Sequence, residues 1–331
     1  MKRREFIGLI GGAAASPLVA RAQQPAKRKR LAIINPATKP DDMRIGGDPN
    51  FTIFFEEIKR LGYVEGVNLI VERYSAEGRF DRFPEIAHEV VATRPDVIFS
   101  FSDNVALALK AETRTIPIVA WTGDPIAVGI VSNLARPGGN ITGVSVDAGA
   151  EIGRKVVQLL AEAVGNLSNA RELTKPPTWD RYKSYREAAE RLNISLRLEP
   201  LQPPVNEASY RRIFDAMQRD HVDGLLILPD SENYTHRHLL GRLAQQYRLP
   251  AISFYTETTE AGALMSHAFD VKAGFRRTAA QIVEILNGGN PAEMPYFQET
   301  HWELVINLKA AKELGLEIPA GLIAGADTVI E

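Results

Sequence analysis

The chain of 331 residues contains no cysteine, which excludes disulfide bonds, thiolate metal sites, thiol nucleophiles and a lipid anchor on a cysteine. Positive charge is not in excess, since 39 Lys and Arg residues stand against 41 Asp and Glu residues. The formal net charge of -2 argues against a broad basic surface for nucleic acid. No Gly-x-Gly-x-x-Gly follows a predicted strand, and no phosphate-binding loop with Gly-Lys-Ser/Thr is present. We therefore expect no cofactor, no metal site and no nucleic-acid partner.

The first 22 residues have the pattern of a removable export signal. Lys2, Arg3 and Arg4 precede a weakly apolar run of Gly and Ala, and a small-x-small cleavage site ends at Ala22. The apolar run is about half of the roughly 20 residues that a membrane-spanning helix needs. The paired arginines favour the twin-arginine export route. We therefore predict that residues 1–22 are a signal peptide and that the mature protein is soluble in the periplasm.

From Leu31 onward, short apolar segments alternate with longer segments of helical periodicity. The expected strands are Leu31–Asn35, Asn68–Tyr74, Val97–Phe101, Ile118–Trp121 and Ile141–Val144. The expected helices between them are Asn50–Leu61, Phe83–Thr93 and Asn104–Thr113. Apolar strands that alternate with helices predict a parallel sheet that is covered on both faces.

The second half of the chain repeats this plan about 130 residues later. The repeated landmarks are Arg60-Leu61-Gly62 with Arg191-Leu192-Asn193, Asp96-Val97 with Asp223-Gly224, and Pro117 with Pro250. We therefore expect an α/β protein with two Rossmann-like lobes, whose parallel sheets are joined by a hinge of several crossovers. Lobe 1 should comprise residues 31–143 and 262–300, and lobe 2 residues 144–261 and 301–331. One expected strand, at 170–174, is unusual because it contains Arg171 and Glu172 in a buried position.

Polar residues stand where the expected strands end, and ligands bind at the carboxyl ends of strands in open parallel sheets. The candidates are Pro36, Ala37, Ser102, Asp103, Thr122, Gly123 and Asp124 in lobe 1, and Asp230, Ser231, Tyr255 and Glu257 in lobe 2. Polar residues at such positions also cap helices. Capping alone does not require polar residues at the strand ends of both lobes, so we favour a ligand between the lobes. Asp103, Asp124 and Asp230 would also suit acid–base catalysis, although no nucleophile lies beside them.

Several strings of the sequence carry a resemblance to a known family. They are Leu61–Asn68 (LGYVEGVN), Arg94–Ile98, Thr115–Val119 with Asp124-Pro125 after it, Leu134–Gly143 (LARPGGNITG) and Glu303–Lys309. With these strings the chain resembles, from about Leu31 to its C-terminus, the ABC transporter substrate-binding proteins of the tryptophan/tyrosine-binding type. The resemblance implies the type-1 periplasmic-binding fold and a binding protein rather than an enzyme. It also implies a small-molecule ligand and an ABC permease in the inner membrane as partners, and we expect a monomer.

The resemblance also indicates which positions face the ligand cleft. They are Ser102, Asp103, Thr122, Asp124, Asp230 and the loop 255–257. The chain departs from the family pattern at the strand 170–174 and at Ser266-His267-Ala268, where the family tends to have Ser-Tyr-Gly. The second departure puts a titratable imidazole where we expect the chain to pass between the lobes. We therefore include His267 among the candidate ligand residues.

The expected mechanism is closure of the two lobes over an amino acid or an aromatic acid, after which the closed form docks on the permease. N–H groups at helix starts suit a carboxylate, and Asp124 or Asp230 would hold an ammonium. Trp121, Phe254 or Tyr255 would supply a stacking wall. Two alternatives remain: a sensor that presents the bound solute to a membrane receptor, and an enzyme that uses the cleft carboxylates.

Overall fold

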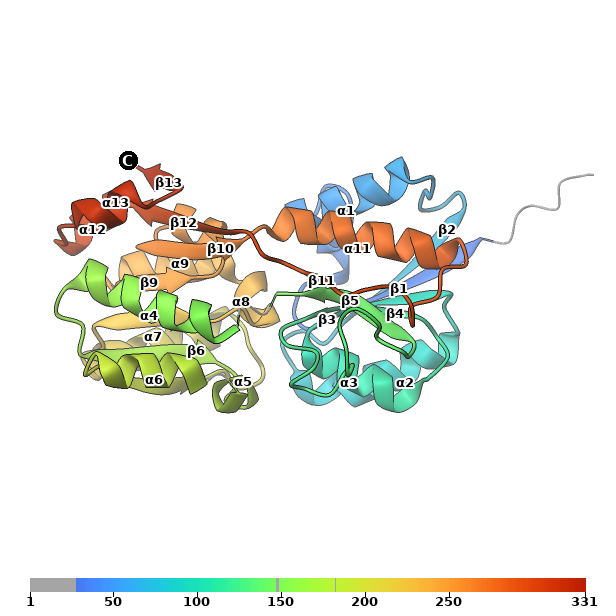
Figure 1. Ribbon diagram of the computed structural model, residues 1–331, viewed down its shortest axis with the longest axis horizontal. Coiled ribbons are helices and arrows are strands. Elements are labelled where there is room, and N and C mark those ends of the chain that lie inside the picture. The colour runs from blue at the N-terminus through green and yellow to red at the C-terminus, as the bar shows by residue number, and fades with distance from the viewer. Residues whose placement is uncertain (1–27, 147–148, 182) are drawn as a thin grey trace, which may run out of the picture.

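The computed structural model describes residues 28–331 except 147, 148 and 182, and the expected signal peptide at 1–22 lies outside these residues. Two lobes lie side by side, and each consists of a sheet between helices (Figure 1). The structure confirms the expected fold class of two α/β lobes with mainly parallel sheets.

The first lobe is built on a six-stranded parallel sheet with the order β11, β5, β4, β3, β1, β2. Its strands are β1 (Lys29–Asn35), β2 (Leu69–Ser75), β3 (Val97–Phe101), β4 (Ile118–Thr122), β5 (Ile141–Ser145) and β11 (Phe297–Gln298). One face is covered by α1 (Pro49–Arg60) and α11 (Val271–Leu286), and the other by α2 (Phe83–Thr93) and α3 (Asp103–Glu112). The short 3-10 helices η1 (Pro40–Asp42) and η2 (Phe80–Arg82) lie in the loops after β1 and β2.

Burial on both faces explains why the first strand lacks the alternation of apolar and polar residues. In β1, Leu31 and Ile33 pack in the core under α1 and α11, while Ala32 and Ile34 pack in the core under α2 and α3. Helix α1 begins after Asp48, whose side chain accepts a hydrogen bond from the Asn50 N–H, as an N-cap does. The helix then buries its aromatic face against the sheet and α11.

The second lobe is built on a seven-stranded sheet with the order β13, β12, β10, β9, β8, β6, β7, in which β10 and β12 are antiparallel. Its strands are β6 (Asn169–Thr174), β7 (Ser195–Pro200), β8 (Gly224–Ile227), β9 (Ala251–Ser253), β10 (Met265–Phe269), β12 (Trp302–Asn307) and β13 (Thr328–Ile330). The helices α4 (Gly149–Val164) and α6 (Lys183–Arg191) cover one face, and α7 (Glu207–Arg219) and α9 (Arg237–Gln246) the other. The remaining helices are α5 (Pro176–Arg181), α8 (Ser231–Thr235), α10 (Thr256–Glu260), α12 (Leu308–Leu314) and α13 (Ala320–Ala324).

The unusual strand at 170–174 is present as β6, at the expected place beside β8. Both charged residues of this strand are buried. Arg171 lies 3.4 Å from a carboxyl oxygen of Asp220 and 3.8 Å from one of Glu199, so its charge is compensated. Glu172 has no such partner among the described residues.

The chain passes between the lobes three times, after β5, after β10 and after β11, because the elements that follow these strands belong to the other lobe. This corrects two expected boundaries of lobe 1. Strand β5 continues to Ser145, two residues past the expected end at 143. Strand β10 pairs with β9 and β12 of the second sheet, so the expected start of the second segment at 262 falls inside lobe 2. An apolar strand fits either sheet, and the residues alone do not say which one it joins.

Candidate functional site

The two lobes face each other across a cavity at the carboxyl ends of their parallel strands. Lobe 1 contributes Phe101, Ser102, Asp103, Asn104, Trp121, Thr122, Gly123, Val146, Val271 and Phe275, and lobe 2 contributes Lys175, Thr178, Pro229, Asp230, Ser231, Tyr234, Tyr255 and Phe269. The cavity has a volume of about 80 Å³. Small-molecule sites occur preferentially at interfaces between domains, so the cavity has the position of a ligand site.

Aromatic side chains from both lobes form much of the cavity wall. In lobe 1, the rings of Phe101 and Trp121 are stacked at 5.7 Å, and Phe275 lies 5.0 Å from the Trp121 ring. In lobe 2, the rings of Tyr234 and Tyr255 meet edge to face at 5.3 Å. Such walls offer flat apolar surfaces from two sides, which suits a planar ring between them.

The polar part of lobe 1 lies at the start of α3. Ser102 has a φ of 80°, a left-handed conformation that costs a non-glycine residue roughly 1–3 kcal/mol. Its N–H donates to the Trp121 carbonyl at 2.9 Å, and its hydroxyl accepts from the Val105 N–H at 3.5 Å. The Asp103 carboxylate accepts from the Gly123 N–H at 2.9 Å. The strained turn thus brings a hydroxyl and the N-terminus of a ten-residue helix to the cavity.

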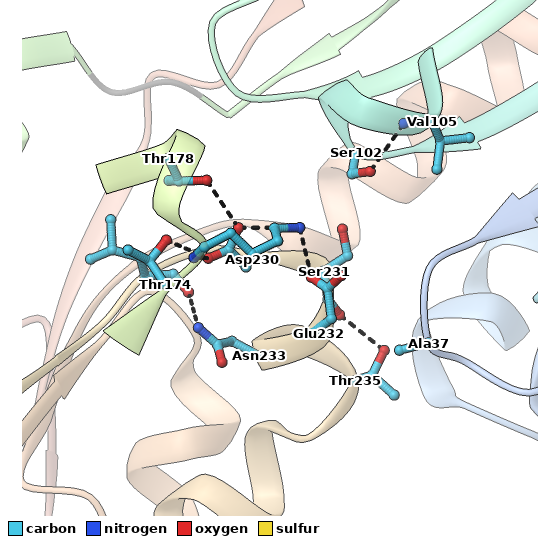
Figure 2. A network of polar contacts seen from close by, with 12 residues as sticks. Ala37, Ser102, Val105, Thr174, Thr178, Asp230, Ser231, Glu232, Asn233 and Thr235 are labelled. Carbon is cyan, nitrogen blue, oxygen red and sulfur yellow. Dashed lines mark hydrogen bonds and ion pairs between the residues drawn. The ribbon is translucent and has the colours of Figure 1, made fainter. Parts of the chain in front are cut away.

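The polar part of lobe 2 is organised around the carboxylate of Asp230 (Figure 2). This side chain accepts hydrogen bonds from the Thr174 hydroxyl at 2.5 Å, from the Thr178 hydroxyl at 3.3 Å and from the Lys175 N–H at 3.3 Å. Both of its oxygens therefore have donors within the protein, and Asp230 is itself buried.

A buried ammonium completes this network. The Nζ of Lys175 lies 2.8 Å from a Glu232 carboxyl oxygen and 3.4 Å from an Asp230 oxygen. Burial lowers the pKa of Lys175, but the two carboxylates more than offset this effect and raise the pKa above its usual value. Lys175 therefore stays charged at neutral pH. The cluster holds two carboxylates and one ammonium, which leaves an excess of negative charge on this side of the cavity.

A fourth ionisable group, Glu172, lies near this cluster but does not line the cavity. It is fully buried, and neither carboxyl oxygen has a hydrogen-bond partner among the described residues. Burial raises the pKa of Glu172 to about 8; Arg186 opposes this shift and Asp230 adds to it. Glu172 is therefore mostly protonated at neutral pH, because a buried carboxyl avoids the cost of an unpaired charge.

The cavity brings together seven of the residues expected from the sequence. They are Ser102, Asp103, Thr122, Gly123, Asp230, Ser231 and Tyr255. Polar strand ends from both lobes thus line one cavity, and ligand binding by these residues stays a prediction. Asp230 differs in one respect from the expectation, because its oxygens already accept from Thr174, Thr178 and Lys175.

Five expected residues lie outside the lining of this cavity. The Asp124 carboxylate accepts from the N–H groups of the second and third residues after it, so it closes a turn on the surface. Glu257 forms an ion pair with Arg237 at 3.3 Å. Pro36 and Ala37 lie in the loop after β1, beside the loop of Gly78, whose N–H donates to the Pro36 carbonyl.

His267 also lies away from the cavity. It is the central residue of β10, opposite Leu304 of β12, rather than a residue at the passage between the lobes. Its ring stacks on Trp302 at 5.6 Å, and its buried Nδ1 has no hydrogen-bond partner among the residues that the structure describes. Burial first and Lys155 second lower its pKa, so the imidazole is neutral at pH 7.

Sequence reasoning did not select several residues that line the cavity, among them Lys175, Thr178, Tyr234, Phe269 and Phe275. Lys175 follows β6 directly, so the rule that ligands meet strand ends would have found it if that strand had been predicted firmly. Tyr234 and Phe275 are on helices, where aromatic residues at helical spacing are also typical of the core. The neighbouring sequence does not distinguish an aromatic residue that lines a cavity from one that packs in the core.

Neither a candidate metal cluster nor a candidate membrane-spanning helix occurs in the part of the chain that the structure describes. Within residues 28–331, apart from 147, 148 and 182, no three His, Asp or Glu side chains are grouped closely enough to hold a metal ion. No helix in the same residues has the length and apolar character that crossing a membrane requires.

Two similar α/β lobes, three crossings of the chain and a cavity between the lobes define a two-lobed ligand-binding protein. Residues 51–330 match the family model described as ABC transporter substrate binding protein. The chain therefore belongs to the ABC transporter substrate-binding protein family, as its sequence strings suggested.

Relatives of known structure and name agree with this assignment. A conserved domain protein from Vibrio cholerae superposes with a TM-score of 0.77 at 26% identity, over 92% of this chain and 100% of that one. An ABC domain in complex with L-Trp from Streptococcus pneumoniae superposes with a TM-score of 0.74 at 22% identity, with the same coverage. A tyrosine-binding protein from Clostridioides difficile is 23% identical over 269 residues, which are 80% of this chain and 76% of the relative. The description of the family and the names of the last two relatives are those of binding proteins.

Proposed function

We propose that this chain is the periplasmic solute-binding component of an ABC importer and that its cleft takes an aromatic amino acid. The observation that carries this proposal is the cavity wall of aromatic rings supplied by both lobes. A planar side chain between the Trp121 and Tyr255 walls is enclosed only when the lobes are close together. Closure is thus coupled to binding, which is what delivery to a permease requires.

The charges around the cavity support a ligand with an ammonium and a carboxylate. The cluster of Lys175, Asp230 and Glu232 carries an excess of negative charge on the side of lobe 2, which attracts an ammonium. On the side of lobe 1, the N-terminus of α3 and the Ser102 hydroxyl suit a carboxylate. An aromatic acid without an amino group would use only the carboxylate site in lobe 1. The names of the relatives, a tyrosine-binding protein and an ABC domain in complex with L-Trp, also favour an amino acid.

Thermal-shift and calorimetric titrations test the ligand class directly. L-tryptophan, L-tyrosine and L-phenylalanine should raise the melting temperature, since a ligand at about 100 times its Kd adds about 2.7 kcal/mol. The matched acids that lack the amino group, indole-3-propionate and 3-phenylpropionate, should bind at least about tenfold more weakly. Tighter binding of the acids would overturn the amino acid assignment, and no binding of either set would overturn the aromatic class.

A pair of tryptophan variants shows whether binding uses this cavity. The chain has three tryptophans, of which Trp121 lines the cavity and Trp302 packs on His267 outside it. Trp121→Leu should weaken ligand binding at least about tenfold, because a stacking wall is lost. Trp302→Leu is the matched control and should leave the Kd unchanged. Equal effects of the two substitutions would place the binding site elsewhere.

A further inference from the structure

The two lobes touch each other at several places outside the cavity. The hydroxyl oxygens of Thr38 in lobe 1 and Thr235 in lobe 2 are 3.0 Å apart, and Figure 2 shows Thr235 turned toward the loop that carries Ala37. The Val205 N–H of lobe 2 donates to the Gly78 carbonyl of lobe 1 at 3.0 Å. A Cβ at Gly78 would lie 2.3 Å from the Val205 oxygen, and its φ is +76°. Backbone meets backbone here, so the lobes are in a closed arrangement.

The strongest of these contacts join the start of α1 to the start of α9. The Asp48 carboxylate of lobe 1 accepts from the Arg237 guanidinium of lobe 2 at 2.8 Å. The Asn50 side chain of lobe 1 donates to the Tyr234 hydroxyl of lobe 2 at 2.7 Å. The Tyr234 hydroxyl in turn donates to Asp48 at 3.4 Å. These four residues therefore form one polar network across the two lobes.

This network is held away from water. The Arg237 side chain is 3% exposed and that of Asp48 is 14% exposed, so their attraction is screened much less than that of a surface pair. The Arg237 guanidinium also lies 4.3 Å from the centre of the Tyr234 ring. Arg237 has a second partner, Glu257, in its own lobe at 3.3 Å. When the lobes separate, Arg237 therefore keeps one carboxylate, and the pair with Asp48 biases the closed form without locking it.

Tyr234 connects this network to the ligand site. Its ring lines the cavity and contacts the Tyr255 ring, while its hydroxyl is held by Asn50 and Asp48 from the opposite lobe. One wall of the cavity in lobe 2 is thus positioned by polar groups of lobe 1. It reaches this position only when the lobes are closed.

We propose that Asp48, Asn50 and Arg237 form an interlobe latch that sets the population of the closed form and positions Tyr234 for the ligand. This inference rests on the proposed function as a binding protein that closes, but not on the identity of the ligand. Asp48 and Arg237 are positioning residues, because neither lines the cavity. A ligand that binds only the closed form has an apparent Kd that rises as the closed population falls.

The absence of cysteine from the chain allows the closed population to be measured without any ligand. A Thr38→Cys, Thr235→Cys double variant places two thiols on either side of the interlobe contact, where they form a disulfide only when the lobes are closed. The rate of disulfide formation in a glutathione buffer then reports closure. Adding Asp48→Asn should slow this rate at least about fivefold, which is the lower end of usual coupling between sites. Asparagine still caps α1, so the helix is retained.

Glu65→Gln is the matched control, because Glu65 pairs with Arg73 at 2.6 Å within lobe 1. It should leave the rate of disulfide formation unchanged. An equal rate with and without Asp48→Asn, or an equal change in both variants, would overturn the latch. Small-angle scattering of the cysteine-free Asp48→Asn protein gives an independent measure. Its radius of gyration should exceed that of the wild type, and identical values would also overturn the latch. A failed search for aromatic amino acid ligands would leave these results as they stand.

Discussion

The buried carboxyl of Glu172 makes the stability of lobe 2 depend on pH in an unusual direction. Its pKa is raised from the ordinary value of 4.5 to about 8, so the folded protein keeps a proton that the unfolded chain has lost. Stability therefore falls as pH rises between these two values, the opposite of the behaviour of a carboxylate held in an ion pair. The slope from this one group is roughly 1.4 kcal/mol for each pH unit.

The total effect is large. The difference between 4.5 and about 8 corresponds to about 5 kcal/mol of unfolding free energy once the pH exceeds both values. Glu172→Leu removes the ionisable group from a fully buried site and replaces it with an apolar side chain of similar size. At pH 9 the variant should be more stable than the wild type by several kcal/mol. At pH 5 the two proteins should differ much less, because the wild-type carboxyl is then neutral.

Urea unfolding followed by circular dichroism at several pH values between about 5 and 9 measures this difference. Glu151→Gln controls for the loss of one negative charge, since that side chain is 92% exposed. Only the pH dependence that separates the two variants is then assigned to Glu172. Wild type and Glu172→Leu with the same slope of stability against pH would refute the reasoning, because Glu172 would then be ionised or paired in the folded protein.

Two further predictions concern the imidazole of β10 and the proposed export signal. The pH profile of ligand affinity between about 6 and 8 should be the same in wild type and His267→Phe, because His267 stacks on Trp302 outside the cavity. Calorimetry across this pH range measures both profiles, and a flatter profile in the variant would return His267 to the ligand site. Replacing Arg3 and Arg4 with lysine should leave the precursor in the cytoplasm, because the twin-arginine route requires the pair. Mature protein at normal periplasmic levels in cell fractionation would exclude that route.

Part of the site was predictable because parallel sheets place their strand ends in a common crevice. Ser102 directly follows β3 and Thr122 is the last residue of β4, so the pattern of strand and loop was enough to bring them to the cavity. The same rule selected Asp124 and Glu257, which lie only a few residues further on. Their side chains turn to other partners: Asp124 to backbone N–H groups of its own turn, and Glu257 to Arg237. A strand pattern shows where a loop begins, but it does not show which residues of the loop face the cavity.

The sequence by itself determined the class of fold, the duplication of the lobes and the family, because these depend on local periodicity and on short strings that a single chain carries. Only the tertiary structure decided that β10 belongs to the second sheet, that Lys175 lies between Asp230 and Glu232, and that Asp48 meets Arg237. Each of these facts joins residues far apart in the chain. The strand that pairs with a given edge and the partner of a buried charge both depend on distant parts of the chain that pack against them. The sequence of one segment therefore does not identify these partners.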